Sequence, residues 1–167
     1  HCFYIINLAS AEKPELYYQY WREFANLLDH KNSYHRDFGL LLISNIVVAD
    51  SENFLSLIWP KYLAHVNDVK FCTAQNCLQG IRKILKVRPD YLNETVELLL
   101  KYDQICNYPE KQKALLSFNI LGIFEDAYPV SSNKIGIQEF IFKSAKSISP
   151  KTKNKAINLK NFLSFKF

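Results

Sequence analysis

The segment CTAQNCLQGIRK, residues 72–83, is one of four segments of equal length that align along the chain. The other three are RDFGLLLISNIV at 36–47, ALLSFNILGIFE at 114–125 and AINLKNFLSFKF at 156–167. Their starts lie 36, 42 and 42 residues apart, and a short polar stretch precedes each one. A period of about 40 residues is typical of proteins built from stacked supersecondary units. The sequence therefore predicts a series of stacked repeats.

Each aligned segment is predicted to be a helix, which we call the A helix of its repeat. In the segment at 72–83 and just beyond it, Leu78, Ile81 and Leu85 fall at three- and four-residue steps, which places them on one stripe of a helix. A second helix, the B helix, has its own apolar stripe and is predicted before or after each A helix. The predicted B helices are Pro14–His30, Glu52–Val66, Asp90–Ile105 and Ile135–Ile148.

The composition agrees with a helical fold. Only 4 Gly and 6 Pro occur among the 167 residues, whereas all-β folds need many turn-forming residues. We therefore expect an all-α fold, namely an α-α superhelix (a right-handed solenoid) of about four helix pairs. The expected pairs are 1–30, 33–66, 69–105 and 109–148, followed by a terminal helix at 152–166, and all of them belong to a single domain that covers 1–167.

The junctions between these helices resemble those of HEAT repeats, which have an ARM-type fold. In the segment LLDHKNSYHR at 27–36, a Leu pair ends the B helix, Asp29 lies in the turn and Arg36 opens the next A helix. An Asp in such a turn can accept hydrogen bonds from backbone N–H groups, and a basic residue can bridge to the Asp of the adjacent repeat. The resemblance implies a binding scaffold but no particular partner. Looser copies of the junction contain Asp68 with Lys70 and Asp103 with Lys113.

The sequence contains no familiar catalytic frame. It has no GxSxG elbow, P-loop or GxGxxG motif, and its cysteines form no CxxC pair. We therefore expect a non-enzymatic protein with no catalytic residue, no metal and no cofactor. His30 and His65 fall at equivalent places in successive repeats, and we interpret them as helix-end residues rather than as a shared metal or catalytic site. Free thiols in a reducing compartment, the cytoplasm, are expected for Cys2, Cys72, Cys77 and Cys106.

The aromatic residues indicate a binding surface. In the predicted helix Pro14–His30, Tyr17, Tyr18, Tyr20 and Trp21 are so close in sequence that they spread around the helix, and some must leave its core face. Exposed aromatics often anchor partners, so we expect a protein partner on the B-helix, concave face. The alternative is that all these rings pack between repeats. The predicted binding residues are Tyr18, Trp21, Arg22, Trp59, Tyr62 and Lys101.

The positive charge of the chain is concentrated at one end. The whole chain has a net charge of +5, and from Lys143 to Phe167 it has seven Lys and no Asp or Glu. Such a region binds nucleic acid, an acidic membrane surface or an acidic protein, or it is simply a solvated surface. The alternative function is therefore a nucleic-acid-binding solenoid that uses the Lys143–Lys166 region.

One enzyme family, the DNA alkylation-repair glycosylases, is built on a HEAT-like solenoid, and this chain resembles that family in architecture. The resemblance implies a basic concave face with aromatics and a carboxylate near the lesion. However, no matching Trp–Asp–Arg set can be placed on this sequence. Outside the lysine-rich end the chain has 14 basic and 16 acidic residues, which is unfavourable for a face that wraps DNA. Glycosylase activity is therefore kept as the enzyme alternative.

The two ends of the chain are expected to differ. Residues 1–9 are predicted to be the tail of an A helix, and no charged residue occurs from Cys2 to Ala11. Because an uncovered helix face leaves core-like surface in water, we expect upstream residues or another molecule, including a second copy, to cover this end. The last helix has lysines between its apolar residues Phe162, Phe165 and Phe167 and is expected to be a polar cap. A column of equivalent core residues is predicted at Leu78, Leu121 and Phe162. No apolar run is long enough to cross a bilayer.

Overall fold

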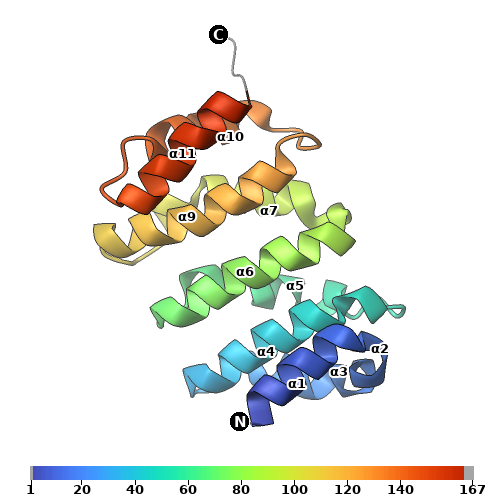
Figure 1. Cartoon of the computed structure of the whole chain (residues 1–167). Helices are drawn as coiled ribbons and strands as arrows, with labels where there is room; N and C mark the ends of the chain where they lie inside the picture. The colour runs from blue at the N-terminus through green and yellow to red at the C-terminus, as the bar shows by residue number, and fades with distance from the viewer. Residues whose placement is uncertain (1, 164–167) are drawn as a thin grey trace. The chain divides into compact units, whose positions relative to one another are not determined.

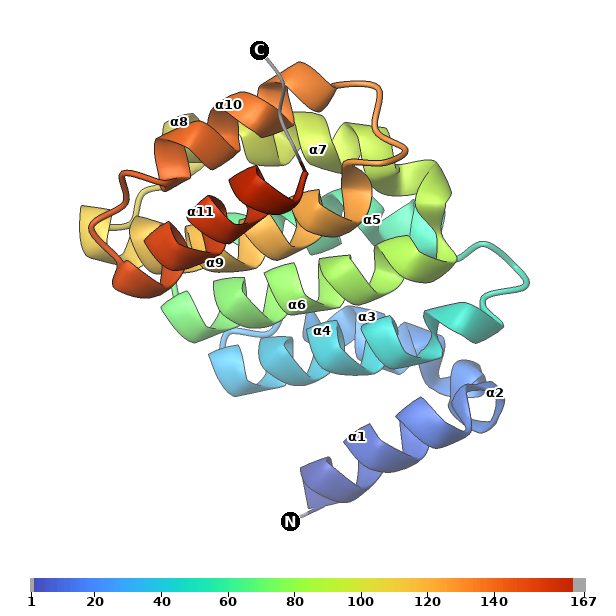
Figure 2. The same cartoon turned by 45° about the horizontal axis from the view of Figure 1, so that its top comes forward.

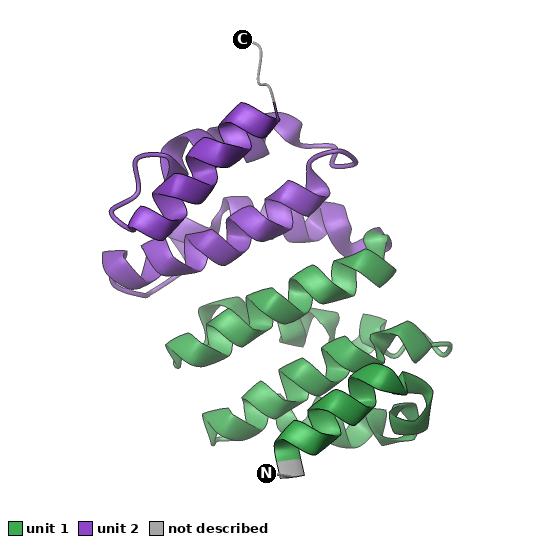
Figure 3. Ribbon diagram, viewed as in Figure 1, with its two compact units in different colours: residues 1–89 green, residues 90–167 purple. Residues whose placement is uncertain are grey.

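The computed structural model describes the backbone of residues 2–163 and the side chains of residues 3–163. Within this range the regular elements are helices and none is a strand, which confirms the all-α prediction for the described residues. The chain divides into two compact units, His1–Pro89 (unit 1) and Asp90–Phe167 (unit 2), which are coloured separately in Figure 3. The division falls inside the predicted pair 69–105. A single superhelical domain over the whole chain stays a prediction, and each unit is described by itself.

Unit 1 contains the A helices α1, α4 and α6, and α4 packs against both of the others. The B helix α3 packs against α4, while α5 and the 3₁₀ turn η3 pack against α6 (Figure 1). Figure 2 shows α4 and α6 lying side by side. The predicted helix Pro14–His30 is divided into α2, η1 and α3. The elements are α1 Cys2–Glu12, α2 Pro14–Tyr17, η1 Tyr18–Tyr20, α3 Trp21–Leu27, α4 Ser33–Ile46, η2 Val47–Ala49, α5 Leu55–Ala64, η3 His65–Asn67 and α6 Phe71–Val87.

Unit 2 has a similar pattern, in which the A helices α9 and α11 pack together and the B helix α10 contacts α7, α9 and α11. The predicted helix Asp90–Ile105 is interrupted at Lys101, where φ is −89° and ψ is 8°. The elements, beginning with the 3₁₀ turn that spans the division between the units, are η4 Pro89–Tyr91, α7 Leu92–Leu100, α8 Tyr102–Ile105, α9 Glu110–Ala127, α10 Lys134–Ser144 and α11 Pro150–Phe162.

The B helix predicted at Glu52–Val66 begins later, at Leu55, because of the turn that precedes it. The Asp50 carboxylate accepts hydrogen bonds from the backbone N–H groups of Phe54 (2.8 Å) and Leu55 (2.9 Å), so it caps the start of α5. Asn53, which lies between Asp50 and the start of α5, has a φ of 58°. This value is in the left-handed region, which a right-handed helix cannot include. The charged residues before Asn53 therefore belong to the loop.

Successive A helices in unit 1 are related by a spacing of 38 residues. The side-chain amide of Asn45 in α4 donates to the side-chain oxygen of Asn7 in α1 (2.9 Å), and Lys83 in α6 donates to the side-chain oxygen of Asn45. Core residues repeat with the same spacing, and all of them are fully buried. The spacing of 36 predicted from the aligned segments 36–47 and 72–83 is thus two residues short. The buried pairs are Leu40 with Leu78, Ile43 with Ile81 and Ile46 with Ile84.

The predicted bridge between an A-helix basic residue and the Asp of the next repeat is confirmed for Arg36. Its guanidinium donates to both oxygens of the Asp68 carboxylate (2.8 and 2.7 Å) and to the carbonyl of His30 (2.8 Å). Asp68 also accepts a hydrogen bond from the Lys70 N–H (2.8 Å), as predicted for a turn carboxylate, and its other oxygen lies 2.8 Å from Nδ1 of His65. Burial favours a raised pKa for Asp68, but these hydrogen bonds outweigh it and lower the pKa.

The predicted core column is correct at two of its three positions. Leu78 and Leu121 are fully buried, whereas Phe162 is 80% exposed, so its placement in the core is wrong. The buried side of α11 carries Thr152, Ala156 and Leu159, at alternating steps of four and three residues. A further step of four leads to Leu163, so Phe162 lies beside this stripe and not at its centre. In the described residues α11 ends at Phe162, and the predicted end at 166 lies outside them. The predicted cap residues Phe165, Lys166 and Phe167 lie outside the described residues.

Gly80 is expected to tolerate no side chain, because α5 approaches α6 closely at this point. A Cβ atom on Gly80 would lie 1.9 Å from the hydroxyl oxygen of Tyr62. We expect Gly80→Ala to lower the free energy of unfolding by about 1–3 kcal/mol, as overpacking does, in urea melts followed by circular dichroism. The Tyr62→Phe substitution removes this hydroxyl oxygen, so Gly80→Ala should lower the free energy of unfolding by less in a Tyr62→Phe background. Equal losses in the two backgrounds would contradict the close contact.

Candidate functional site

Three of the four aromatic residues in the predicted binding set are core residues instead. Trp21, Trp59 and Tyr62 are 3%, 2% and 0% exposed, so none of them presents its ring to a partner. The ring of Trp59 stacks on that of Tyr62 at 5.7 Å, and the Tyr62 hydroxyl donates to the carbonyl of Leu40 (2.9 Å). In α5 the residues Leu55, Trp59 and Tyr62 form the buried stripe at four- and three-residue steps. The prediction that Trp21, Trp59 and Tyr62 contact a partner is therefore corrected.

The other predicted residues are at least partly accessible. Tyr18 is half-buried, and its hydroxyl donates to the Asp50 carboxylate (2.9 Å). Burial and this acceptor raise the pKa of Tyr18. Its role is thus to hold the loop before α5. Arg22 and Lys101 are exposed, the first in unit 1 and the second in unit 2.

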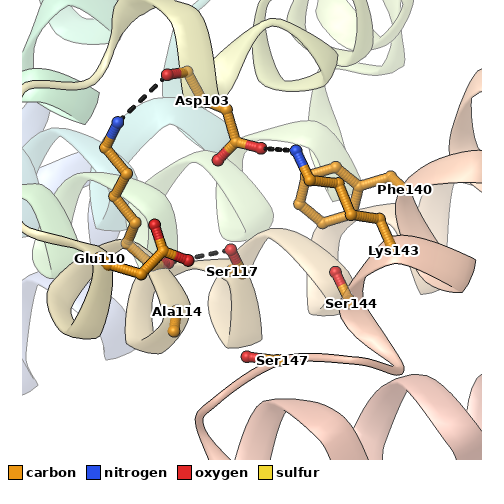
Figure 4. Close-up of a pocket in the computed structure, with 9 residues that line it drawn as sticks. Asp103, Glu110, Ala114, Ser117, Phe140, Lys143, Ser144 and Ser147 are labelled. Atoms are coloured by element: carbon orange, nitrogen blue, oxygen red, sulfur yellow. Dashed lines mark hydrogen bonds and ion pairs between the residues drawn. The ribbon is translucent and has the colours of Figure 1, made fainter.

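A polar pocket of about 360 Å³ lies in unit 2 (Figure 4). The first turns of α9 contribute residues at three- and four-residue steps, which places them on one side of the helix. The helix α10 contributes three more side chains in the same way, and α8 contributes Asp103. The pocket is lined by Asp103, Glu110, Lys113, Ala114, Ser117, Phe140, Lys143, Ser144 and Ser147.

An ion pair, hydrogen bonds and a ring contact hold the side chains of this pocket in place. The Lys143 ammonium is ion-paired with the Asp103 carboxylate, and Figure 4 shows the two side chains pointing toward one another. The Lys113 ammonium donates to the backbone carbonyl of Asp103 (3.1 Å), and the Ser117 hydroxyl donates to the carbonyl of Lys113 (2.9 Å). The half-buried Phe140 ring packs against Phe124 in a T-shaped arrangement with ring centroids 5.0 Å apart, so it forms an apolar wall of the pocket. The pocket therefore combines charges of both signs with one aromatic surface.

A second depression, of about 440 Å³, shares Asp103, Phe140 and Lys143 with the first. It lies between the B helices α7 and α10, and its other lining residues are Glu97, Leu100, Asn133, Ile135, Gly136 and Glu139. We call the two depressions together the B-side groove. Its carboxylates are Glu97, Asp103, Glu110 and Glu139, and its only lining cations are Lys113 and Lys143. Four negative charges against two positive charges leave a net charge of −2.

The B-side groove could be predicted from the sequence only in part. The junction pattern singles out Asp103 and Lys113, and Lys143 is the first residue of the lysine-rich region. Nothing in the sequence indicates that Asp103 and Lys143, 40 residues apart, form an ion pair. Nothing in the sequence singles out Glu97 or Glu139, because exposed carboxylates on amphipathic helices are ordinary solvated residues.

The lysine-rich end is spread over more than one face of unit 2. Lys143 belongs to the B-side groove, whereas Lys151 and Lys155 lie over the ring of Phe118 at 4.2 and 5.0 Å. Lys155 is also paired with the Glu125 carboxylate (3.1 Å). These lysines therefore have partners within the chain and do not gather on the groove.

The histidines and cysteines have local contacts. The rings of His30 and His35 lie 4.1 Å apart, and His65 is bound to Asp68. Between residues 3 and 163, no group of at least three His, Cys, Asp or Glu side chains is placed to hold a metal ion. Cys72, Cys77 and Cys106 are free thiols, and burial raises the pKa of Cys77 well above its ordinary value. The predicted free thiol of Cys2 lies outside the described side chains.

No protein-family model, curated protein or solved structure compared with this chain matches it. No helix in the described part of the chain combines the length and apolar character needed to cross a membrane.

Proposed function

We propose that this chain is a non-enzymatic, HEAT-like helical-repeat scaffold that binds a basic segment of a protein partner in the B-side groove of unit 2. The observation that carries the proposal is the net charge of −2 on a groove lined by the B helices α7, α8 and α10 and by the first turns of the A helix α9. A negative groove attracts Lys or Arg side chains and repels phosphates. The apolar surfaces of Phe140, Leu100 and Ile135 add contacts for neighbouring aliphatic groups.

The size of the groove supports a polypeptide partner. Depressions of about 360 and 440 Å³ each suit one or two side chains rather than a folded domain. The free thiols are consistent with a reducing compartment, and we propose the cytoplasm on that basis. The runner-up is a nucleic-acid-binding or alkylation-repair solenoid that uses the lysine-rich end. It is less well supported because Lys143 and Lys155 already bind carboxylates, and because Trp21 and Trp59 are buried.

The experiment is a selection of peptides from a random display library against the intact chain. We expect the selected peptides to be rich in Lys and Arg and to bind more weakly as salt increases. Glu139→Lys in the groove should weaken the affinity of a selected, fluorescein-labelled peptide about tenfold, which corresponds to about 1.4 kcal/mol. Glu94→Lys is the matched control, since Glu94 is an exposed carboxylate on the B helix α7 that does not line the groove.

Peptide binding that is indifferent to Glu139→Lys would contradict the proposal. Binding of a labelled DNA duplex that is lost in a Lys151→Glu, Lys155→Glu double variant would instead support the runner-up. Both measurements use fluorescence anisotropy at several salt concentrations, because phosphate contacts produce a steep salt dependence.

A further inference from the structure

The Asp103 carboxylate is shared by both depressions of the B-side groove, together with Phe140 and Lys143. Its side chain is 42% exposed, so a ligand in either depression can reach it. This carboxylate is occupied by the chain itself, because the Lys143 ammonium binds its Oδ2 atom (Figure 4). Lys113 binds a different atom of Asp103, its backbone carbonyl oxygen (3.1 Å). Lys143 is therefore the side chain that a basic ligand meets at the Asp103 carboxylate.

The ion pair between Lys143 and Asp103 can exchange with a ligand because it lies at the surface. The Lys143 side chain is 72% exposed, so water solvates its ammonium once it leaves the carboxylate. An exposed ion pair contributes little free energy, since water screens its charges and the long lysine side chain loses freedom when it is held. The pair of Arg36 with Asp68 is the opposite case, because both side chains are almost fully buried. Lys143 is therefore a weakly held occupant of the groove carboxylate.

The Arg36 bridge shows how an arginine binds a carboxylate at a junction of this chain. Its guanidinium donates to both oxygens of Asp68, at 2.8 and 2.7 Å. Asp103, like Asp68, lies in a junction that precedes an A helix. An ammonium group has no planar pair of donors, and Lys143 binds Asp103 through the single oxygen Oδ2. An arginine of a partner would therefore form a second hydrogen bond with Asp103 that a lysine cannot form.

The Phe140 ring gives an arginine a further advantage over a lysine. This half-buried ring lines both depressions, and Lys143 follows it by three positions on the same side of α10. A side chain that binds Asp103 in place of Lys143 therefore lies next to the ring. A guanidinium is planar and weakly hydrated, so it stacks on an aromatic face more favourably than an ammonium does.

We infer that the B-side groove selects an arginine of the basic partner segment, and that this arginine binds the Asp103 carboxylate in place of Lys143. Lys143 is thereby an internal competitor for the groove. A ligand binds more weakly when the competent form of its site is less populated, and the competent form here is the one in which Lys143 has left Asp103. The inference rests on the proposed function, because it names the partner side chain that this same groove binds.

The test uses two fluorescein-labelled peptides of equal charge, an arginine-containing peptide from the display selection and its copy with every Arg replaced by Lys. We expect the Lys copy to bind the intact chain about tenfold more weakly in fluorescence anisotropy. Lys143→Arg keeps the charge of the groove but holds Asp103 more tightly, so it should weaken binding of the Arg peptide about threefold. Lys143→Met frees Asp103 and should strengthen that binding about threefold more than Lys113→Met does. Lys113→Met is the matched control, since it changes the groove charge equally but leaves the ion pair of Asp103 with Lys143 in place.

Equal affinities of the two peptides would overturn the inference, and so would a selection that yields Lys without Arg. It would also be overturned if Lys143→Met acted no more strongly than Lys113→Met, or if Lys143→Arg cost no affinity. Because Lys143 is exposed, both of its variants should melt near the temperature of the wild type. A failure of every basic peptide to bind, or binding that is indifferent to Glu139→Lys, would contradict the proposed function and this inference with it, so the two failures can be told apart.

Discussion

Asp68→Ala is expected to lower the free energy of unfolding by about 3–5 kcal/mol. The reason is that Arg36 would keep its charge while it lost both oxygens of the carboxylate that binds it. The side chains of Arg36 and Asp68 are only 9% and 4% exposed, so water cannot replace the lost partner easily. His65 and the Lys70 N–H would lose their acceptor as well. Urea melts followed by tryptophan fluorescence measure the effect, since Trp21 and Trp59 both lie in unit 1.

Lys61→Ala is the control for this prediction. Lys61 and Asp29 also connect residues 32 positions apart, but their side chains are 44% and 64% exposed. An exposed ion pair contributes about 0–1 kcal/mol, so the control should change stability little. Comparable losses for Asp68→Ala and Lys61→Ala would show that the Arg36 bridge is not buried in solution.

The effect of Asp68→Ala should also depend on pH. Because the folded state lowers the pKa of Asp68 below its ordinary value of 3.8, the charged carboxylate stabilises unit 1 fully above that value. This stabilisation is lost as the pH falls through the lowered pKa of the folded state. The difference in stability between the wild type and Asp68→Ala should therefore be constant near neutral pH and shrink in acid.

Leu78→Ala and Leu121→Ala are each expected to lower the free energy of unfolding by about 2–5 kcal/mol. Both side chains are fully buried, in α6 and α9, so each truncation removes buried apolar area and leaves a cavity. Phe162→Ala is the control, because this ring is 80% exposed, and its effect should stay within about 0.5 kcal/mol. Urea melts followed by circular dichroism report on helices of both units. Losses below about 1 kcal/mol for both leucines would mean that the column is not core.

The A helices and the Arg36 bridge could be predicted because both depend on local patterns. The stripe through Leu78, Ile81 and Leu85 has the period of a helix, and the junction pattern places Arg36 near the start of one A helix and Asp68 in the turn before the next. Asp68 and Arg36 meet because α4 and α6 pack against each other.

The sequence leaves the burial of Trp59 and Tyr62 open as one of two alternatives, because α5 is apolar on more than one side. Leu57 is 77% exposed while Leu55 is fully buried, although both are leucines two positions apart. Hydrophobicity alone therefore does not fix which side of this helix faces the core. The B-side groove depends on the pairing of Asp103 with Lys143, which requires the relative placement of α8 and α10. The sequence contains no local signal for that placement.

The spacing that relates Asn7, Asn45 and Lys83 has a consequence for folding kinetics. Each of these links joins residues 38 positions apart, so a helix of unit 1 reaches its neighbour after closing a short loop of chain. Loop-closure entropy grows with the logarithm of loop length, and topologies rich in such near-neighbour contacts have low contact order and fold rapidly. We therefore expect unit 1 to fold rapidly.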